Sequence, residues 1–115
     1  MAGTVAYVRV STEKQAEKGF SLEVQTEKVR AMAVVQGVDL VEVIVDRGES
    51  AKSLDRPGMV RLLELVGRKA IDRVIVAKLD RLTRSVKDLA NLLEQFERRK
   101  VALVSVAESL DTQSA

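Results

Sequence analysis

The feature that most constrains this fold is the regular alternation of short β-branched runs with longer stretches of helical spacing. The short runs predict strands over residues 5–10, 40–45, 73–77 and 101–106. The stretches between them predict helices over residues 22–36, from 57 onward and over 86–100. This alternation predicts a three-layer α/β/α fold: an open, mostly parallel sheet of four to five strands with helices on both faces. The polar tail carries no predicted element.

Each predicted helix begins at a residue that suits a helix N-terminus. Ser21 and Ser85 can cap the first and third helices with their hydroxyl groups, and Asp88 completes a capping box with Ser85. Pro57 fits the first position of the second helix. Gly37 ends the first helix, because glycine readily adopts the left-handed conformation of a C-terminal stop.

Polar segments follow the first three predicted strands. Ser11 comes directly after the first strand, a polar loop over 46–56 follows the second, and the segment 78–84 follows the third. We expect the loop over 46–56 to be mobile, because it has almost nothing to bury. Functional sites of open α/β sheets gather at the carboxyl ends of the strands, so these three segments should meet at one edge.

The first strand carries an arginine among apolar residues. Side chains alternate along a strand, so Tyr7, Arg9 and Ser11 should point to the same side. A buried guanidinium needs an anionic partner. The residues alone leave two alternatives equally open for Arg9: a structural ion pair with an internal aspartate, or a bound anionic ligand.

The segment after the third strand contains Asp80, Arg81 and Arg84. If this segment forms a helical turn, the two arginines share one face and can hold a phosphate, with Asp80 orienting one of them. The alternative is that Asp80 and Arg81 are ordinary turn residues and that Arg84 is merely exposed.

Three more residues are candidates from their positions. Arg56, at the end of the polar loop, could swing onto a bound phosphate, and Gln15 and Gln25 could donate hydrogen bonds to its oxygens. The alternative for all three is an ordinary solvated side chain.

The composition excludes several kinds of chemistry. The chain has no cysteine and no histidine, which excludes a zinc site and a Ser-His-Asp hydrolase. A serine among arginines suits phosphoryl transfer without metal or cofactor, because positioning and charge neutralisation carry most of that catalysis. The net charge of +2 is weak evidence. A cationic patch over 73–84 suits a phosphate-bearing ligand, but charge alone favours a solvated basic surface there. With no apolar run of about 20 residues and no basic N-terminal region, we expect a cytoplasmic protein without membrane contact.

Five motifs together resemble those of the serine recombinases, the family of resolvases, invertases and phage-type integrases. They are YVRVSTEKQ over residues 7–15, SLEVQ over 21–25, DRGESAKSLDRPG over 46–58, KLDRLTRS over 78–85 and ESLDT over 108–112. They stand in the order and at the spacing of the family over nearly the whole chain. GFSLEVQ and SLDT look more like the large integrase and transposase branch than the small resolvases.

The resemblance implies a mechanism and a set of site residues. Ser11 would attack a DNA phosphodiester and form a 5′-phosphoserine link, and four subunits would exchange and religate the strands without ATP. Arg9, Arg81 and Arg84 match the active-site arginines of the family, Asp80 and Gln25 match supporting residues, and Arg56 matches the loop arginine. Gln15, Lys52 and Lys78 are the candidate DNA contacts. Some small members also use a lysine on the second helix, and Gly67, Arg68 and Lys69 fall near that place.

The resemblance also implies a domain organisation. Residues 1–115 correspond to the catalytic domain, ending where the long dimerisation helix and the DNA-binding region would follow. We expect this domain to fold but to recombine DNA poorly or not at all alone, and the full-length protein to act as a dimer or tetramer.

Two alternatives from other classes remain at this stage. The chain could be a degenerate recombinase-like module kept for oligomerisation, although such a module would have no chemical reason to keep Ser11 with its arginines. It could also be a doubly wound signalling domain with a magnesium site, although Asp46 and Asp80 lack a third acid on the first strand, where Arg9 stands.

Overall fold

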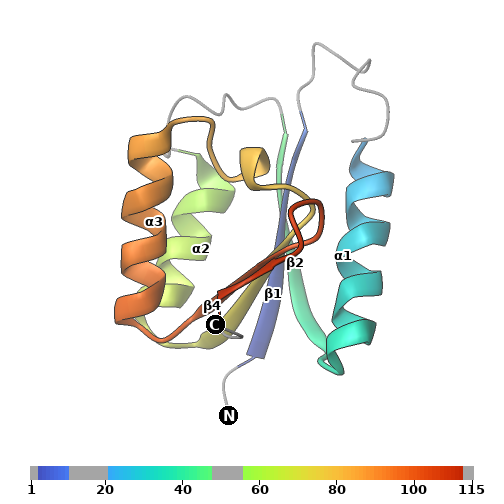
Figure 1. Ribbon diagram of the computed structural model, residues 1–115, viewed down its shortest axis with the longest axis horizontal. Helices are drawn as coiled ribbons and strands as arrows, with labels where there is room; N and C mark the ends of the chain where they lie inside the picture. Colours follow the sequence, from blue (N-terminus) through green and yellow to red (C-terminus); the bar gives the residue numbers. More distant parts are fainter. Residues whose placement is uncertain (1–2, 11–20, 48–55, 113–115) are drawn as a thin grey trace.

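A five-stranded sheet forms the centre of the protein (Figure 1). The computed structural model describes residues 3–10, 21–47 and 56–112. The strands are β1 (Gly3–Val10), β2 (Leu40–Arg47), β3 (Ile71–Val76), β4 (Ala102–Ser105) and β5 (Leu110–Asp111). Their order is β2-β1-β3-β4-β5, with β1 to β4 parallel and β5 antiparallel to β4.

Helices cover both faces of this sheet, which confirms the predicted three-layer α/β/α fold. The helices are α1 (Leu22–Gln36), α2 (Pro57–Gly67) and α3 (Val86–Arg98), with a single 3₁₀ turn, η1 (Leu79–Arg81), after β3. Figure 1 shows α1 on one side of the sheet and α2 and α3 on the other. In the described part of the chain, no helix is both long and apolar enough to cross a membrane.

The core forms in two layers because successive strand residues face opposite sides. Val5 and Tyr7 of β1 pack towards α2 and α3, whereas Ala6 and Val8 pack towards α1. The central strands are buried on both faces, as parallel strands between helix layers must be. This explains why they appear in the sequence as short continuous apolar runs.

The capping predictions hold at three helix ends. The Ser21 hydroxyl accepts from the backbone nitrogen of Val24, and the Ser85 hydroxyl accepts from that of Asp88. Gly37 ends α1 with a φ of 70°, in the left-handed region. These caps fix where α1 and α3 begin, directly beside the carboxyl ends of the strands.

Several strand and helix boundaries differ slightly from the sequence predictions, and two differences concern the site and the sheet edge. β2 continues to Arg47, so Asp46 belongs to the strand rather than to the polar loop. The two-residue strand β5 lies within the tail that carried no predicted element. It has one apolar residue, Leu110, too few for a period-two pattern, and it forms because the chain turns back onto the edge of β4.

Candidate active site

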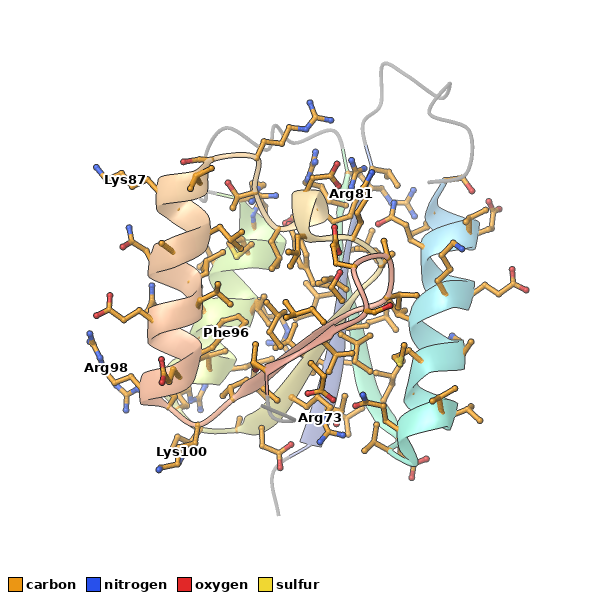
Figure 2. All side chains as sticks on the ribbon, in the orientation of Figure 1. Arg73, Arg81, Lys87, Phe96, Arg98 and Lys100 are labelled. Atoms are coloured by element: carbon orange, nitrogen blue, oxygen red, sulfur yellow. The ribbon has the colours of Figure 1, made fainter. Side chains whose placement is uncertain are left out.

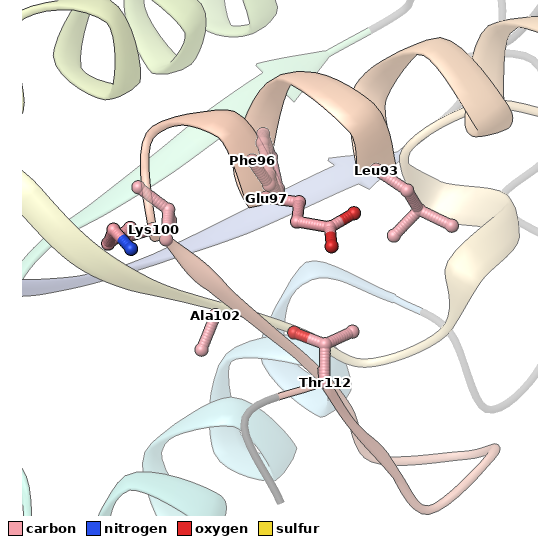
Figure 3. Close-up of a pocket in the computed structure, with 7 residues that line it drawn as sticks. Leu93, Phe96, Glu97, Lys100, Ala102 and Thr112 are labelled. Atoms are coloured by element: carbon pink, nitrogen blue, oxygen red, sulfur yellow. The ribbon is translucent and has the colours of Figure 1, made fainter. Parts of the chain in front are cut away.

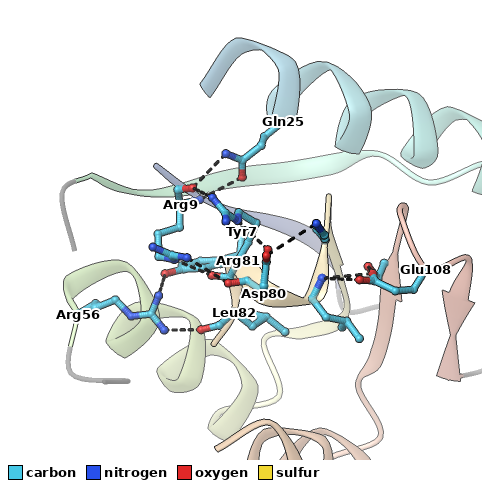
Figure 4. Close-up of polar contacts among 11 residues, drawn as sticks. Tyr7, Arg9, Gln25, Arg56, Asp80, Arg81, Leu82 and Glu108 are labelled. Atoms are coloured by element: carbon cyan, nitrogen blue, oxygen red, sulfur yellow. Dashed lines mark hydrogen bonds and ion pairs between the residues drawn. The ribbon is translucent and has the colours of Figure 1, made fainter. Parts of the chain in front are cut away.

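The carboxyl end of β1 is held by a glutamine of α1. Gln25 is fully buried. Its Oε1 accepts from the backbone nitrogen of Arg9 at 3.3 Å, and its Nε2 donates to the backbone oxygen of Arg9 at 3.0 Å (Figure 4). This amide thus pairs with both backbone groups of Arg9, as a neighbouring strand would. Gln25 therefore supports the backbone that leads to Ser11, and the expectation of a solvated glutamine is wrong.

β1 and η1 contact each other through two arginines. The Arg9 guanidinium donates to the backbone oxygen of Arg81 at 3.2 Å and to that of Asp80 at 3.1 Å. In return, Arg81 Nη1 donates to the backbone oxygen of Arg9 at 3.3 Å. Arg81 Nε donates to the Asp80 carboxylate at 3.0 Å, so Asp80 orients this guanidinium as the sequence predicted. Both arginines are only 4% exposed.

Arg56 is a buried member of the same cluster. It precedes α2 and is 1% exposed. Its guanidinium donates to the Tyr7 hydroxyl at 3.0 Å and to the backbone oxygen of Leu82, and its central carbon lies 5.8 Å from the centroid of the Tyr7 ring. Its Nε is buried without a hydrogen-bond partner among the described residues. The alternative of a solvated loop arginine is therefore wrong, because tertiary contacts bury the side chain. A movement of Arg56 onto a bound phosphate stays a prediction.

Sequence reasoning missed the residue that joins these elements, Asp46. It is 3% exposed, and its carboxylate accepts from the Tyr7 hydroxyl at 2.6 Å and from the backbone nitrogens of Gly58 at 2.7 Å and Met59 at 3.1 Å. Asp46 therefore caps α2, whose own N-cap residue, Arg56, makes no side-chain cap bond. It lies opposite Arg9 in the register of β2 on β1, which only the structure shows. The available sequence signal was an acid directly after the apolar run over 40–45.

Gly58 leaves room for that carboxylate. A Cβ atom at this position would lie 2.7–2.8 Å from the carboxyl carbon and oxygens of Asp46. Real Cβ atoms do not approach so closely, so any larger residue would displace Asp46 or the first turn of α2. Pro57 is thus explained because proline suits the first position of a helix. Gly58 is explained by the space that the Asp46 carboxylate occupies.

The cluster concentrates positive charge. Burial lowers the pKa of Arg9, and the positive charges of Arg81, Arg56 and Arg84 lower it further. Backbone carbonyls, which carry no net charge, accept from the guanidiniums of Arg9 and Arg56, whereas Arg81 also pairs with the Asp80 carboxylate. A site with several crowded cations gains most from an anion with several oxygens, such as a phosphate.

Arg84 and Lys78 lie at the margin of the cluster. η1 ends at Arg81, and Arg84 is exposed while Arg81 is buried, so the expectation that they share one face of a helical turn is wrong. Arg84 is still near enough for its positive charge to lower the pKa of Arg9. Lys78 is partly buried, with its Nζ 3.9 Å from the Asp80 carboxylate.

The remaining candidates do not join the described cluster. Ser11, Gln15 and Lys52 lie outside the described residues. Ser11 directly follows Val10, the last residue of β1, in the sequence. The segment 67–69 lies at the opposite end of α2 from Arg56, roughly 15 Å away at the rise of an α-helix. It therefore cannot supply a helix lysine to this site.

A separate cavity of about 480 Å³ lies at the far end of the molecule (Figure 3). It is formed by the end of α3, the start of β4 and Thr112. Figure 2 shows Lys100 and Arg98 at this end and Arg81 at the other. None of the candidate site residues that the structure describes lines the cavity, so the arginine cluster is the better place to look for the chemistry.

Tyr7 offers a direct test of this buried network by titration. Burial raises its pKa well above its ordinary value, and its hydrogen bond to Asp46 adds to the rise. Because the folded-state pKa is raised, the stability that it contributes is present below about pH 10 and is lost as pH rises through the folded-state pKa. Tyr7 is the only tyrosine, so phenolate absorbance reports this residue alone. We expect its titration midpoint above pH 10 in the folded protein and near 10 in denaturant; equal midpoints would contradict the buried contact.

Comparison with known proteins places the chain in a family. Residues 4–115 match the family described as "Resolvase, N terminal domain". The chain belongs to this family of resolvase N-terminal catalytic domains of serine recombinases. The predicted resemblance is confirmed, including its branch: the solved catalytic domain of TP901-1 integrase is 41% identical with a TM-score of 0.90, over 98% of this chain and 84% of that one.

Other relatives agree with this assignment. The catalytic domain of ISC1926 TnpA, an IS607-like serine recombinase, is 32% identical with a TM-score of 0.77, over 90% of this chain and 66% of that one. The DNA-invertase hin of Salmonella typhimurium is 34% identical over 112 residues, which cover 97% of this chain and 52% of the invertase. The serine recombinase gin of Escherichia phage Mu is 34% identical over 110 residues, 96% of this chain and 50% of the relative. This serine recombinase domain thus spans about half the length of these two relatives.

Proposed function

We propose that this domain cuts and rejoins DNA in site-specific recombination, with Ser11 as the nucleophile. One observation carries the proposal: the buried guanidiniums of Arg9, Arg56 and Arg81 converge at the carboxyl end of β1, and Ser11 is the second residue after Arg9. A hydroxyl nucleophile that follows a strand ending in several buried cations is suited to attack on a phosphodiester.

The chemistry is balanced without an external energy source. The Ser11 hydroxyl oxygen forms a bond to the phosphorus, and the bond from phosphorus to the 3′ oxygen breaks. The 5′ phosphate stays on the serine, and the proton lost by the serine is balanced by the proton gained by the released 3′-hydroxyl. Religation is the reverse reaction with a new 3′-hydroxyl, so the number of phosphoester bonds is unchanged.

The arginine cluster would act on the transition state. Attack places five oxygens around the phosphorus and increases the charge on the non-bridging oxygens, which guanidinium donors neutralise. The cluster is held by backbone carbonyls, Asp80 and Tyr7, so its donors need little reorganisation during the reaction. Arg84, exposed at its margin, would complete the charge around a bound phosphate.

Other parts of the proposal concern the partners. Gln15, Lys52 and Lys78 would contact the DNA backbone, and cleavage of two duplexes requires an oligomer, as a dimer or tetramer of the full-length protein.

Asp46 and Asp80 already accept hydrogen bonds from protein groups, which disfavours the alternative of a magnesium-binding signalling domain.

The test is to trap the covalent intermediate. The protein as its gene encodes it would be incubated with DNA from both flanks of that gene, digested and examined by mass spectrometry. We expect a nucleotide adduct on the peptide that contains Ser11, absent from the matched Ser11→Ala variant. An adduct on another residue would keep the reaction and move the nucleophile. Bound DNA with no cleavage and no adduct would favour the non-catalytic oligomerisation module.

A further inference from the structure

Glu108 lies on the short turn between β4 and β5 and contacts the start of η1, 29 residues earlier in the chain. The backbone nitrogen of Leu79 donates to its two carboxylate oxygens at 3.2 and 3.4 Å (Figure 4). The hydroxyl of Ser105, a fully buried residue of β4, donates to the same carboxylate. Lys78, the N-cap residue of η1, makes no side-chain cap bond. Glu108 therefore supplies from a distant turn the acceptor that η1 lacks locally.

The backbone around Glu108 is itself attached to the end of β3. The backbone nitrogen of Val106 donates to the oxygen of Val76 at 3.0 Å, and that of Ala107 donates to the oxygen of Ala77 at 2.9 Å. Ser109 has a φ of 53°, which closes the turn after Glu108. The Glu108 side chain thus starts from a backbone that the central sheet holds in place.

The turn that Glu108 contacts organises the whole arginine cluster. Three consecutive backbone oxygens, those of residues 80–82, accept from guanidiniums: the first two from Arg9 and the third from Arg56. The same turn carries Arg81, whose side chain reaches back to the Arg9 backbone. A displacement of η1 would therefore move the partners of all three buried arginines together.

We propose that Glu108 is a positioning residue for the arginine cluster. By accepting the first amide of η1, it sets where the carbonyls of that turn lie, and these carbonyls set the guanidiniums against the phosphate. This inference rests on the proposed function, because the arginines matter to the rate only if the domain cleaves DNA. A misplacement of the charged donors weakens their stabilisation of the transition state more than it weakens their binding of the ground state.

The test separates anchoring from charge and from folding. Glu108→Ala removes the acceptor, Glu108→Gln keeps an oxygen for the Leu79 amide, and Glu97→Ala is a matched control that removes an exposed acid of α3 at the far end of the molecule. In single-turnover cleavage by the full-length protein, we expect the rate with saturating DNA to fall roughly tenfold to a hundredfold in Glu108→Ala. We expect little change in DNA affinity, substantial recovery in Glu108→Gln and a wild-type rate in Glu97→Ala.

A second measurement works without DNA. Hydrogen exchange at the Leu79 amide should be faster in Glu108→Ala than in the wild-type protein and Glu108→Gln. Wild-type cleavage by Glu108→Ala, an equal loss in Glu108→Gln, or unchanged exchange at Leu79 would overturn the inference. No adduct in the wild-type protein would instead overturn the proposed function and the catalytic part of this inference, while the exchange result would still decide whether Glu108 anchors η1.

Discussion

Replacement of Arg81 by lysine is expected to lower the rate of DNA cleavage about 100-fold to 1,000-fold, as for the loss of one transition-state donor. Arg81 uses its forked guanidinium in two directions, with Nε on the Asp80 carboxylate and Nη1 on the Arg9 backbone oxygen. A lysine ammonium is a single point of charge and cannot reproduce this fork. The charge would remain, so the loss would measure geometry rather than electrostatics alone.

The measurement is single-turnover cleavage, with covalent adduct at Ser11 as the product. Arg61→Lys is the matched control: Arg61 also makes a bidentate contact, with Glu42, but it is exposed and lies on α2 away from the cluster. We expect the control to cleave at the wild-type rate, because an exposed ion pair contributes little to the stability of the fold and Arg61 lies away from the cluster. A rate for Arg81→Lys within about threefold of wild type, against the hundredfold loss expected for a missing donor, would remove Arg81 from the catalytic set.

Asp46→Ala is expected to destabilise the folded protein by about 3–5 kcal/mol, because it leaves three buried donors without their acceptor and each unsatisfied donor costs roughly 1–3 kcal/mol. The substitution leaves the Tyr7 hydroxyl and the first amides of α2 without their acceptor, beside the buried charge of Arg56. A domain of this size is stable by only about 5–15 kcal/mol, so the loss would be a large part of the total.

Urea unfolding followed by circular dichroism measures this effect. Asp72→Ala, which removes an exposed acid of β3, is the matched control and should change stability by less than about 0.5 kcal/mol. Tyr7→Phe should fall between the two, because it removes one of the three donors and leaves the cap on α2. Equal stability of Asp46→Ala and Asp72→Ala would contradict the role of Asp46 as the junction of β1, β2 and α2.

The fold was predictable because its strands and helices carry strong local patterns. Strands covered on both faces are continuous apolar runs, and capping residues such as Ser21 and Ser85 mark the helix starts. β5 was not predictable, since two residues with one apolar side chain have no period and depend on the edge of β4 for their hydrogen bonds. The predicted end of β2 was wrong for a related reason. Asp46 is charged, and hydrogen bonds from three donors make it compatible with a buried strand.

The sequence predicted which residues gather at the candidate site better than it predicted which groups they contact. The strand-end rule correctly brought Arg9 and the segment with Asp80 and Arg81 to one edge. It could not show that Gln25 pairs with a backbone or that Arg56 is buried, because both contacts join residues far apart in the sequence. Ser11, Gln15 and Lys52 lie outside the described residues, so their roles stay predictions.

By itself the sequence determined the layer architecture, the edge at which the polar residues gather, and a set of charged and hydroxyl side chains suited to a phosphodiester. These follow from periodicity, helix caps and residue chemistry, all of which act locally. Only the tertiary structure decided that Asp46 caps α2, that carbonyls of η1 hold Arg9 and Arg56, and that Glu108 reaches the start of that turn. These contacts depend on where the packed sheet places distant backbone groups, and no spacing along the chain encodes that placement.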